Sequence, residues 1–91
     1  MLTYTVAYRL EMGSFFAEVL DFPEAVAIGP TVAETRRNLL SALRYAAEGR
    51  LQKGELLPMP DPGRGAVDAY LVERVTVLPG EGQWVRVQVA G

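Results

Sequence analysis

The sequence predicts an α+β fold in which one helix covers one face of an antiparallel or mixed β-sheet. Apolar residues alternate with polar residues near both ends of the 91-residue chain, as in half-buried strands. A single long segment between these strands repeats its apolar residues with the period of a helix. The expected order is a β-β-β-α-β core followed by one more strand, so that the chain ends in a β-hairpin. We expect residues 1–91 to form a single domain.

The first two strands are predicted to form a hairpin. Residues 2–10 alternate between large apolar side chains and polar or small ones, and residues 15–20 form a second strand. Between them, Gly13 can adopt the positive φ that a tight turn requires.

A break and a short third strand are expected next. Pro23 has no N–H for a ladder hydrogen bond, so residues 21–24 are predicted to interrupt the sheet. Residues 25–28 then form a short strand, which stops at Gly29 and Pro30.

The helix has the clearest signals in the sequence. Thr31 and Glu34 form the pattern of a capping box, in which two side chains satisfy backbone N–H groups at a helix start. The helix is predicted to run from Val32 to about Gln52, with Gly54 in the left-handed conformation that ends many helices.

Helical spacing divides this segment into an apolar stripe and a polar face. The apolar stripe consists of Val32, Leu39, Leu40, Leu43, Ala46 and Ala47. The polar face consists of Glu34, Arg37, Ser41, Arg44, Glu48 and Gln52. We expect the apolar stripe to pack on the sheet.

The remainder of the chain is predicted to be a loop and a hairpin. Residues 1–60 contain the first three strands and the helix, and residues 61–66 form a loop rich in Pro and Gly. Residues 67–91 form the β-hairpin, with strands at residues 67–78 and 83–89.

Composition excludes several classes of function. The sequence contains no Cys and no His, which removes disulfides, thiolate and His metal sites, and catalysis by either side chain. A net charge of −2 argues against a protein that mainly grips a nucleic-acid backbone. We therefore expect a protein that is not an enzyme, with no catalytic residue, no cofactor and no metal. No apolar run is long enough to span a membrane, so we expect a cytoplasmic protein that does not bind membranes.

The sequence also argues against a two-metal nuclease. A two-metal nuclease of the ribonuclease H type needs several carboxylates that converge on one site. Such a site requires an acid in the middle of the first strand, where this chain has Val6 and Ala7. We interpret the carboxylates near the first two strands as solvated face and turn residues: Glu11, Glu18, Asp21 and Glu24.

Arg36 is a charged residue that helical spacing places inside the apolar stripe, between Val32 and Leu40. In one interpretation, its aliphatic stem covers the sheet while its guanidinium reaches solvent. In the other, the guanidinium is presented at an interface to a carboxylate. Arg36 is therefore a candidate interface residue.

Five further residues are candidates for a partner or oligomer interface. Tyr45 is an aromatic residue on the polar helix face, and Tyr is enriched at interfaces. Trp84 and Arg86 share one face of the last strand, where they either contact a partner or cover the sheet edge of their own subunit. Val85 and Val87, on the opposite face, could form part of an oligomer contact.

Several short motifs, in their order and spacing, resemble the HicB-type antitoxin domain over about residues 2–60. The motifs are Tyr4-Thr5-Val6, Phe16-Ala17-Glu18-Val19, Asp21-Phe22-Pro23, Gly29, Thr31-x-x-Glu34, Gly54 and Pro58-Met59-Pro60. This resemblance implies a partial ribonuclease H-like fold without nuclease activity. It also implies neutralisation of a small basic HicA-type toxin, a ribonuclease, by covering its catalytic surface.

The chain departs from the family pattern in two places. Many family members carry a C-terminal helix-turn-helix or ribbon-helix-helix segment, whereas residues 61–91 show no second amphipathic helix, which puts DNA binding in doubt. Glu24 and Ala25 stand where the family usually has Gly and Cys, which changes the turn chemistry.

Three hypotheses follow for the function. The first is an antitoxin that binds a small basic toxin, because an acidic domain suits a basic partner. The second is a solitary domain of the same fold that only self-associates, and in either case we expect a homo-oligomer, a dimer or a tetramer. The third is a weak nuclease.

Overall fold

The computed structural model describes residues 1–90, which contain one helix and five strands. The elements, in chain order, are β1 (Leu2–Glu11), β2 (Ser14–Val19), β3 (Phe22–Gly29), α1 (Val32–Gln52), β4 (Leu71–Pro79) and β5 (Val85–Val89). The predicted α+β class is therefore confirmed.

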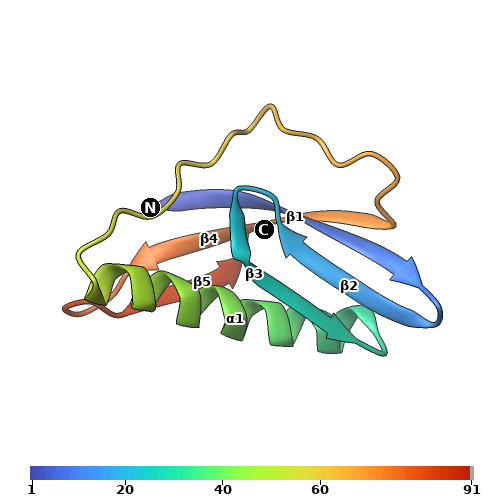
Figure 1. Cartoon of the computed structure of the whole chain (residues 1–91), viewed down its shortest axis with the longest axis horizontal. Coiled ribbons are helices and arrows are strands. Elements are labelled where there is room, and N and C mark those ends of the chain that lie inside the picture. Colours follow the sequence, from blue (N-terminus) through green and yellow to red (C-terminus); the bar gives the residue numbers. More distant parts are fainter. Residues whose placement is uncertain (91) are drawn as a thin grey trace.

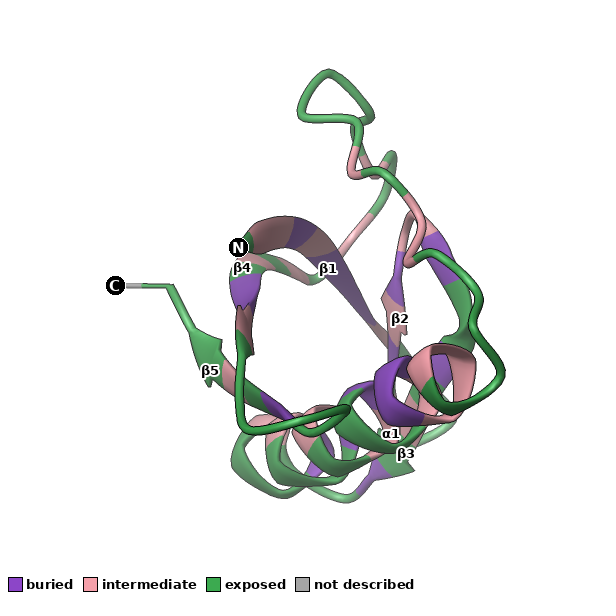
Figure 2. Ribbon diagram, turned by 90° about the vertical axis from the view of Figure 1, so that its left-hand side faces the viewer, coloured by how far each residue is buried: buried purple, intermediate pink, exposed green. Residues whose placement is uncertain are grey.

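All five strands form one antiparallel sheet in the order β3-β2-β1-β4-β5, with β1 in the centre (Figure 1). The sheet curls, and Figure 2 shows its strands in an arc with α1 lying across the open side, near β3 and β5. The inner face of the sheet therefore packs against α1, and its outer face points away from the helix.

The first hairpin turns through the two residues between β1 and β2. Glu11 lies opposite Ser14, and the connecting residues Met12 and Gly13 both have positive φ, at 50° and 81°. This pair of angles is typical of a type I′ turn, whose twist matches that of the strands it joins. Gly13 adopts the conformation that the sequence predicts, whereas Met12 adopts one that side chains disfavour.

The predicted break after β2 is present but shorter than expected, because a turn at Leu20 and Asp21 separates β2 from β3, which begins at Phe22 and includes Pro23. The register shifts at this point, since Val19 lies opposite Phe22 while Glu18 lies opposite Val26. Extra residues on β3 therefore form an irregularity rather than a longer interruption. Strand β3 is an edge strand, where a proline without an N–H is tolerated.

The helix bounds agree with the prediction, from Val32 to Gln52. The Thr31 side chain accepts a hydrogen bond from the Glu34 backbone N–H at 3.1 Å, which satisfies one of the free donors at the helix start. At the other end, Gly54 has a φ of 75°. This conformation lets the chain reverse, as the capping motif requires.

The core lies between the inner face of the sheet and α1. Tyr4 and Phe22 meet edge to face with ring centroids 5.7 Å apart, an arrangement that adds to the apolar burial. The largest fully buried apolar side chains are Tyr4, Tyr8, Phe22, Leu39, Leu43, Val6, Val19 and Val75.

Gly29 allows the start of α1 to approach the end of β3. A Cβ atom on Gly29 would lie 2.7 Å from the Thr35 Oγ1 and 3.0 Å from the Thr35 backbone nitrogen. Thr35 itself is fully buried and donates its hydroxyl to the Thr31 carbonyl at 2.7 Å. The close packing at this corner therefore requires a residue without a side chain.

The last two strands begin later than predicted. Strand β4 starts at Leu71 rather than residue 67, and β5 starts at Val85 rather than residue 83. The chain before β4 is extended and turned instead, and Asp68 has a positive φ of 64°. The two strands are antiparallel neighbours, and their inward-facing residues continue the core.

The long connection between α1 and β4, residues 53–70, is tied to the first strands. The Tyr4 hydroxyl donates to the Pro58 carbonyl at 2.6 Å, and the Tyr70 N–H donates to the Tyr8 carbonyl at 2.7 Å. Burial raises the pKa of Tyr4 to about 12, with the nearby Arg50 opposing this rise. The phenol therefore stays protonated and keeps its hydrogen bond at ordinary pH.

Candidate protein-binding surfaces

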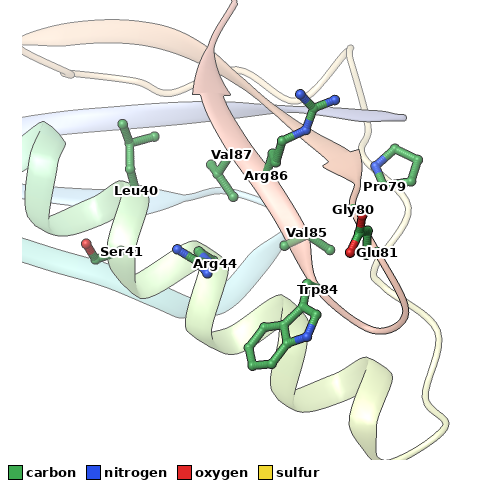
Figure 3. A pocket seen from close by; sticks show the side chains of 10 residues that line it. All are labelled: Leu40, Ser41, Arg44, Pro79, Gly80, Glu81, Trp84, Val85, Arg86 and Val87. Atoms are coloured by element: carbon green, nitrogen blue, oxygen red, sulfur yellow. The ribbon is translucent and has the colours of Figure 1, made fainter.

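The first candidate surface is an open groove between α1 and the β4–β5 turn (Figure 3), with a volume of about 720 Å³. The residues that line it are Leu40, Ser41, Arg44, Pro79, Gly80, Glu81, Trp84, Val85, Arg86 and Val87. Both apolar and charged side chains therefore face one hollow.

Four of the six residues that the sequence singles out line this groove. Trp84 is 56% exposed, Arg86 is exposed, Val87 is half-buried and Val85 is buried in the core. Tyr45, the fifth, is 83% exposed on α1 and does not line the groove. Whether any of them contacts a partner stays a prediction.

Glu48 bonds two residues that line this groove, and its burial corrects the predicted polar face of the helix. The side chain is buried rather than solvated, and the residue is only 8% exposed. Its Oε2 accepts the Val85 backbone N–H at 3.0 Å and the Arg44 Nε–H at 3.2 Å. The start of β5 is therefore bonded to the helix, a long-range contact that helical periodicity does not reveal.

Arg36 meets a carboxylate of its own chain, and whether it also contacts a partner stays a prediction. Its guanidinium does not reach freely into solvent, because its Nε–H lies 3.0 Å from Glu73 Oε1 and its Nη2–H also donates to Glu73. Glu73 lies on β4 and accepts the Tyr8 hydroxyl at 2.8 Å as well. The carboxylate that meets Arg36 therefore belongs to the same chain.

In this network, the pKa values of Glu73 and Tyr8 are shifted from their ordinary values. The hydrogen bond from Arg36 is the main reason that the pKa of Glu73 lies below its ordinary value, although partial burial opposes the shift. Burial, followed by the hydrogen bond to Glu73, raises the pKa of Tyr8. Glu73 is therefore charged and Tyr8 protonated at neutral pH, the state in which the network forms.

Among residues 1–90, five side-chain carboxylates form ion pairs with arginines. The pairs are Arg9–Glu18, Arg36–Glu73, Arg44–Glu48, Arg50–Glu24 and Arg64–Asp21. A hydrogen bond from Arg50 is the main cause that lowers the pKa of Glu24. Lowered pKa values are the opposite of what a general acid needs at neutral pH.

A second candidate surface is the end of the β1–β2 hairpin, which we call the acidic end and define as Leu10, Glu11, Phe15, Asp68 and Tyr70. Leu10 lies opposite Phe15 in the sheet, and the Phe15 and Tyr70 rings meet edge to face at 5.2 Å. Leu10 and Tyr70 are exposed. Within residues 1–90, neither Glu11 nor Asp68 forms an ion pair.

The third candidate surface lies on the outer face of the sheet and is absent from the sequence predictions. We call it the outer patch and define it as Arg9, Phe16, Glu18, Val26 and Ile28. Phe16 lies opposite Ile28, and Glu18 lies opposite Val26, so these side chains form neighbouring rows on one face. Arg9 donates to Glu18 at 2.5 Å between the rows.

The outer patch is apolar where a solvated sheet face is usually polar. Phe16, Val26 and Ile28 are 41%, 55% and 52% exposed, and a hollow of about 500 Å³ lies among the patch residues. The sequence carries a signal for this surface, because residues 25–28 are apolar on both faces of β3. A strand that is apolar on both faces is typical of a sheet covered on both sides.

No model of a known protein family matches this chain, and no curated protein matches it in sequence. In the part of the chain that the structure describes, no three carboxylates gather closely enough to hold a metal ion. Over residues 1–90, no helix has the length and apolar composition needed to cross a membrane.

Proposed function

We propose that this protein is a protein-binding domain that acts as a HicB-like antitoxin and neutralises a small basic HicA-type ribonuclease by covering its active surface. The motif pattern of residues 2–60 supports the proposal. The order of the elements, three antiparallel strands followed by a helix and a fourth strand, is compatible with the partial ribonuclease H-like topology of that family.

The observation that carries the proposal is the acidic end. Glu11 and Asp68 are exposed carboxylates that form no ion pair among residues 1–90, and they lie within two positions along the chain of the exposed residues Leu10 and Tyr70. Exposed carboxylates at one end of the molecule are complementary to a basic protein surface. Such charges mainly raise the rate of association and make it sensitive to salt.

The ion pairs described above support a binding role rather than a catalytic one. Arg50 and Arg36 favour the charged forms of Glu24 and Glu73 and restrain their side chains. Glu24 and Glu73, whose pKa values are lowered, stay ionised and do not deliver protons at neutral pH.

The test is co-expression with the small basic protein encoded by the neighbouring gene. We expect one complex in gel filtration at low salt, loss of RNA cleavage by that partner, and weaker association as the salt concentration rises. Two separate peaks at low salt would reject the proposal.

Charge-reversal variants locate the contact. Glu11→Arg with Asp68→Arg should lower the association rate of the complex by about tenfold or more at low salt. Glu55→Arg with Glu81→Arg is the matched control, since it changes the net charge equally at exposed positions outside the acidic end. An equal effect of both variants would show that the acidic end is not the binding surface.

A second candidate function is self-association without a toxin, and the outer patch favours it. A contiguous apolar surface on a sheet is a common site of protein contact. The purified protein tests this candidate alone, because light scattering then reports only its own assembly. A strict monomer would reject it.

A further inference from the structure

We propose that the outer patch binds a second copy of this chain, so that two sheets pack face to face across a twofold axis. The inference rests on the second candidate function, self-association, and names its surface. It concerns the outer face of β1, β2 and β3, which is separate from the groove that the sequence predictions single out.

The first argument is the position of the apolar side chains. Val26 and Ile28 on β3 and Phe16 on β2 point away from α1, because they alternate along their strands with the inward-facing residues Ala17, Ala25 and Ala27. Their exposure of 41–55% leaves a substantial apolar area in water. Sheets that pack face to face interdigitate such side chains about 10 Å apart.

The second argument is charge complementarity, which selects a second copy over other occupants. The outer patch contains the ion pair of Arg9 and Glu18, held side by side on neighbouring strands, and a second anion, Glu11, lines the same hollow at its hairpin end. A twofold axis between them places Arg9 of each copy over Glu18 of the other. The same patch is therefore complementary to itself, as a twofold interface requires.

The third argument is shape. The hollow of about 500 Å³ borders Phe16, whose ring is only partly buried. In a twofold pair, Phe16 of each copy can fill the hollow of the other, and reciprocal insertion of an aromatic anchor is how compact interfaces gain affinity.

The size of the patch sets the expected strength. With strands about 4.8 Å apart and residues about 3.4 Å apart, these rows cover roughly 300 Å² per copy. Stable interfaces bury about 800 Å² per partner, so we expect a weak dimer with a dissociation constant of about 0.1 mM.

The experiment is sedimentation equilibrium of the purified protein from about 10 μM to 1 mM. Val26→Lys introduces a charge at the centre of the contact, and each dimer carries it twice. If the lysine of each copy weakens the contact by about 30-fold, the dissociation constant should rise about 1,000-fold. The variant is then a monomer at every concentration tested. Val89→Lys, an exposed position on the opposite edge strand, is the matched control and should dimerise like the original protein.

A charge swap tests the twofold pairing directly. Arg9→Glu and Glu18→Arg should each weaken the dimer by about tenfold or more, because like charges then face one another across the axis. An equimolar mixture of the two variants should dimerise again, since each copy then supplies the charge that the other lacks. Circular dichroism checks that every variant is folded.

The outcomes separate this inference from the proposed functions. A protein that is monomeric at all concentrations rejects both the inference and self-association. A dimer that persists in Val26→Lys, or a charge-swap mixture that stays monomeric, rejects only the inference about the outer patch. Neither result bears on toxin binding, which is measured with the toxin present.

Discussion

The buried carboxylate of Glu48 on α1 accepts the backbone N–H of Val85, 37 positions further along the chain, at 3.0 Å. Val85 is the first residue of β5, at the edge of the sheet, where this N–H has no neighbouring strand to bond. The helix therefore supplies the acceptor that a further strand would supply elsewhere. This bond fixes the β4–β5 turn against α1 and so shapes the groove that contains Trp84.

We predict that Glu48→Ala lowers the free energy of unfolding by about 1–3 kcal/mol, because the Val85 N–H is then buried without an acceptor. Glu48→Gln keeps an acceptor oxygen and should cost less. Hydrogen exchange of the Val85 amide reports the bond directly and should accelerate in Glu48→Ala. Arg44→Ala, which removes only an exposed ion-pair partner, should change stability by about 0.5 kcal/mol or less.

We predict that the Arg36–Glu73 pair makes stability depend on pH in the acid range. The pKa of Glu73 is lower in the folded chain than in the unfolded chain, chiefly through the Arg36 hydrogen bond. Its contribution is therefore complete above the unfolded pKa of about 4.3 and is lost as pH falls through the folded pKa.

Glu73→Gln isolates this contribution. At pH 7 the variant should be less stable than the original protein by about 1.5–3 kcal/mol, the range for hydrogen bonds to charged groups. The difference should shrink as the pH falls below about 4, when measured by urea unfolding at each pH. A difference that is constant from neutral to acid pH would contradict the assigned role of the carboxylate.

Met12 provides a stabilising substitution. It is fully exposed and has a φ of 50°, in the left-handed region that Asn and Gly adopt more readily. Met12→Asn should therefore raise the free energy of unfolding by about 0.5–1 kcal/mol in thermal unfolding, without removing a buried contact. Met59→Asn, at an exposed position that lacks a positive φ, should leave stability unchanged.

Two glycines should respond in opposite directions to alanine. Gly29→Ala places a Cβ within 2.7 Å of the Thr35 Oγ1 and should lower the free energy of unfolding by about 1–3 kcal/mol. Gly49→Ala, inside α1 with open space around the new Cβ, should raise it by about 1 kcal/mol. Equal effects of the two substitutions would show that close packing at the β3–α1 corner is unimportant.

Local signals explain which elements the sequence predicts well. The helix begins after Thr31 and ends before Gly54 because both cap residues act on backbone groups within a few positions. The predicted break extends too far, over Pro23, because the cost of a missing N–H depends on whether a neighbouring strand lies on that side. Whether such a neighbour is present depends on the strand order of the complete sheet, in which β3 is an edge strand.

The candidate surfaces were predictable only in part, for the same reason. Trp84, Val85, Arg86 and Val87 are consecutive, so the sequence places them on one strand, although their shared groove with α1 depends on the fold. Arg36 pairs with a carboxylate on β4, which lies far along the chain, and no local sequence pattern indicates such a pair. The outer patch combines residues of three strands, although the apolar residues on both faces of β3 already indicate that its outer face is unusual.

The central position of β1 has a consequence for how the chain folds. Thr3 and Thr76 are hydrogen-bonded neighbours although they are 73 positions apart, because β1 pairs with β4. One long edge of the first strand therefore stays open during synthesis until β4, Leu71–Pro79, has left the ribosome. Pairings between such distant segments slow folding and leave strand edges available for intermolecular association. The nascent chain is thus most prone to aggregation before β4 arrives, and shortening the connection before β4 should shorten that interval.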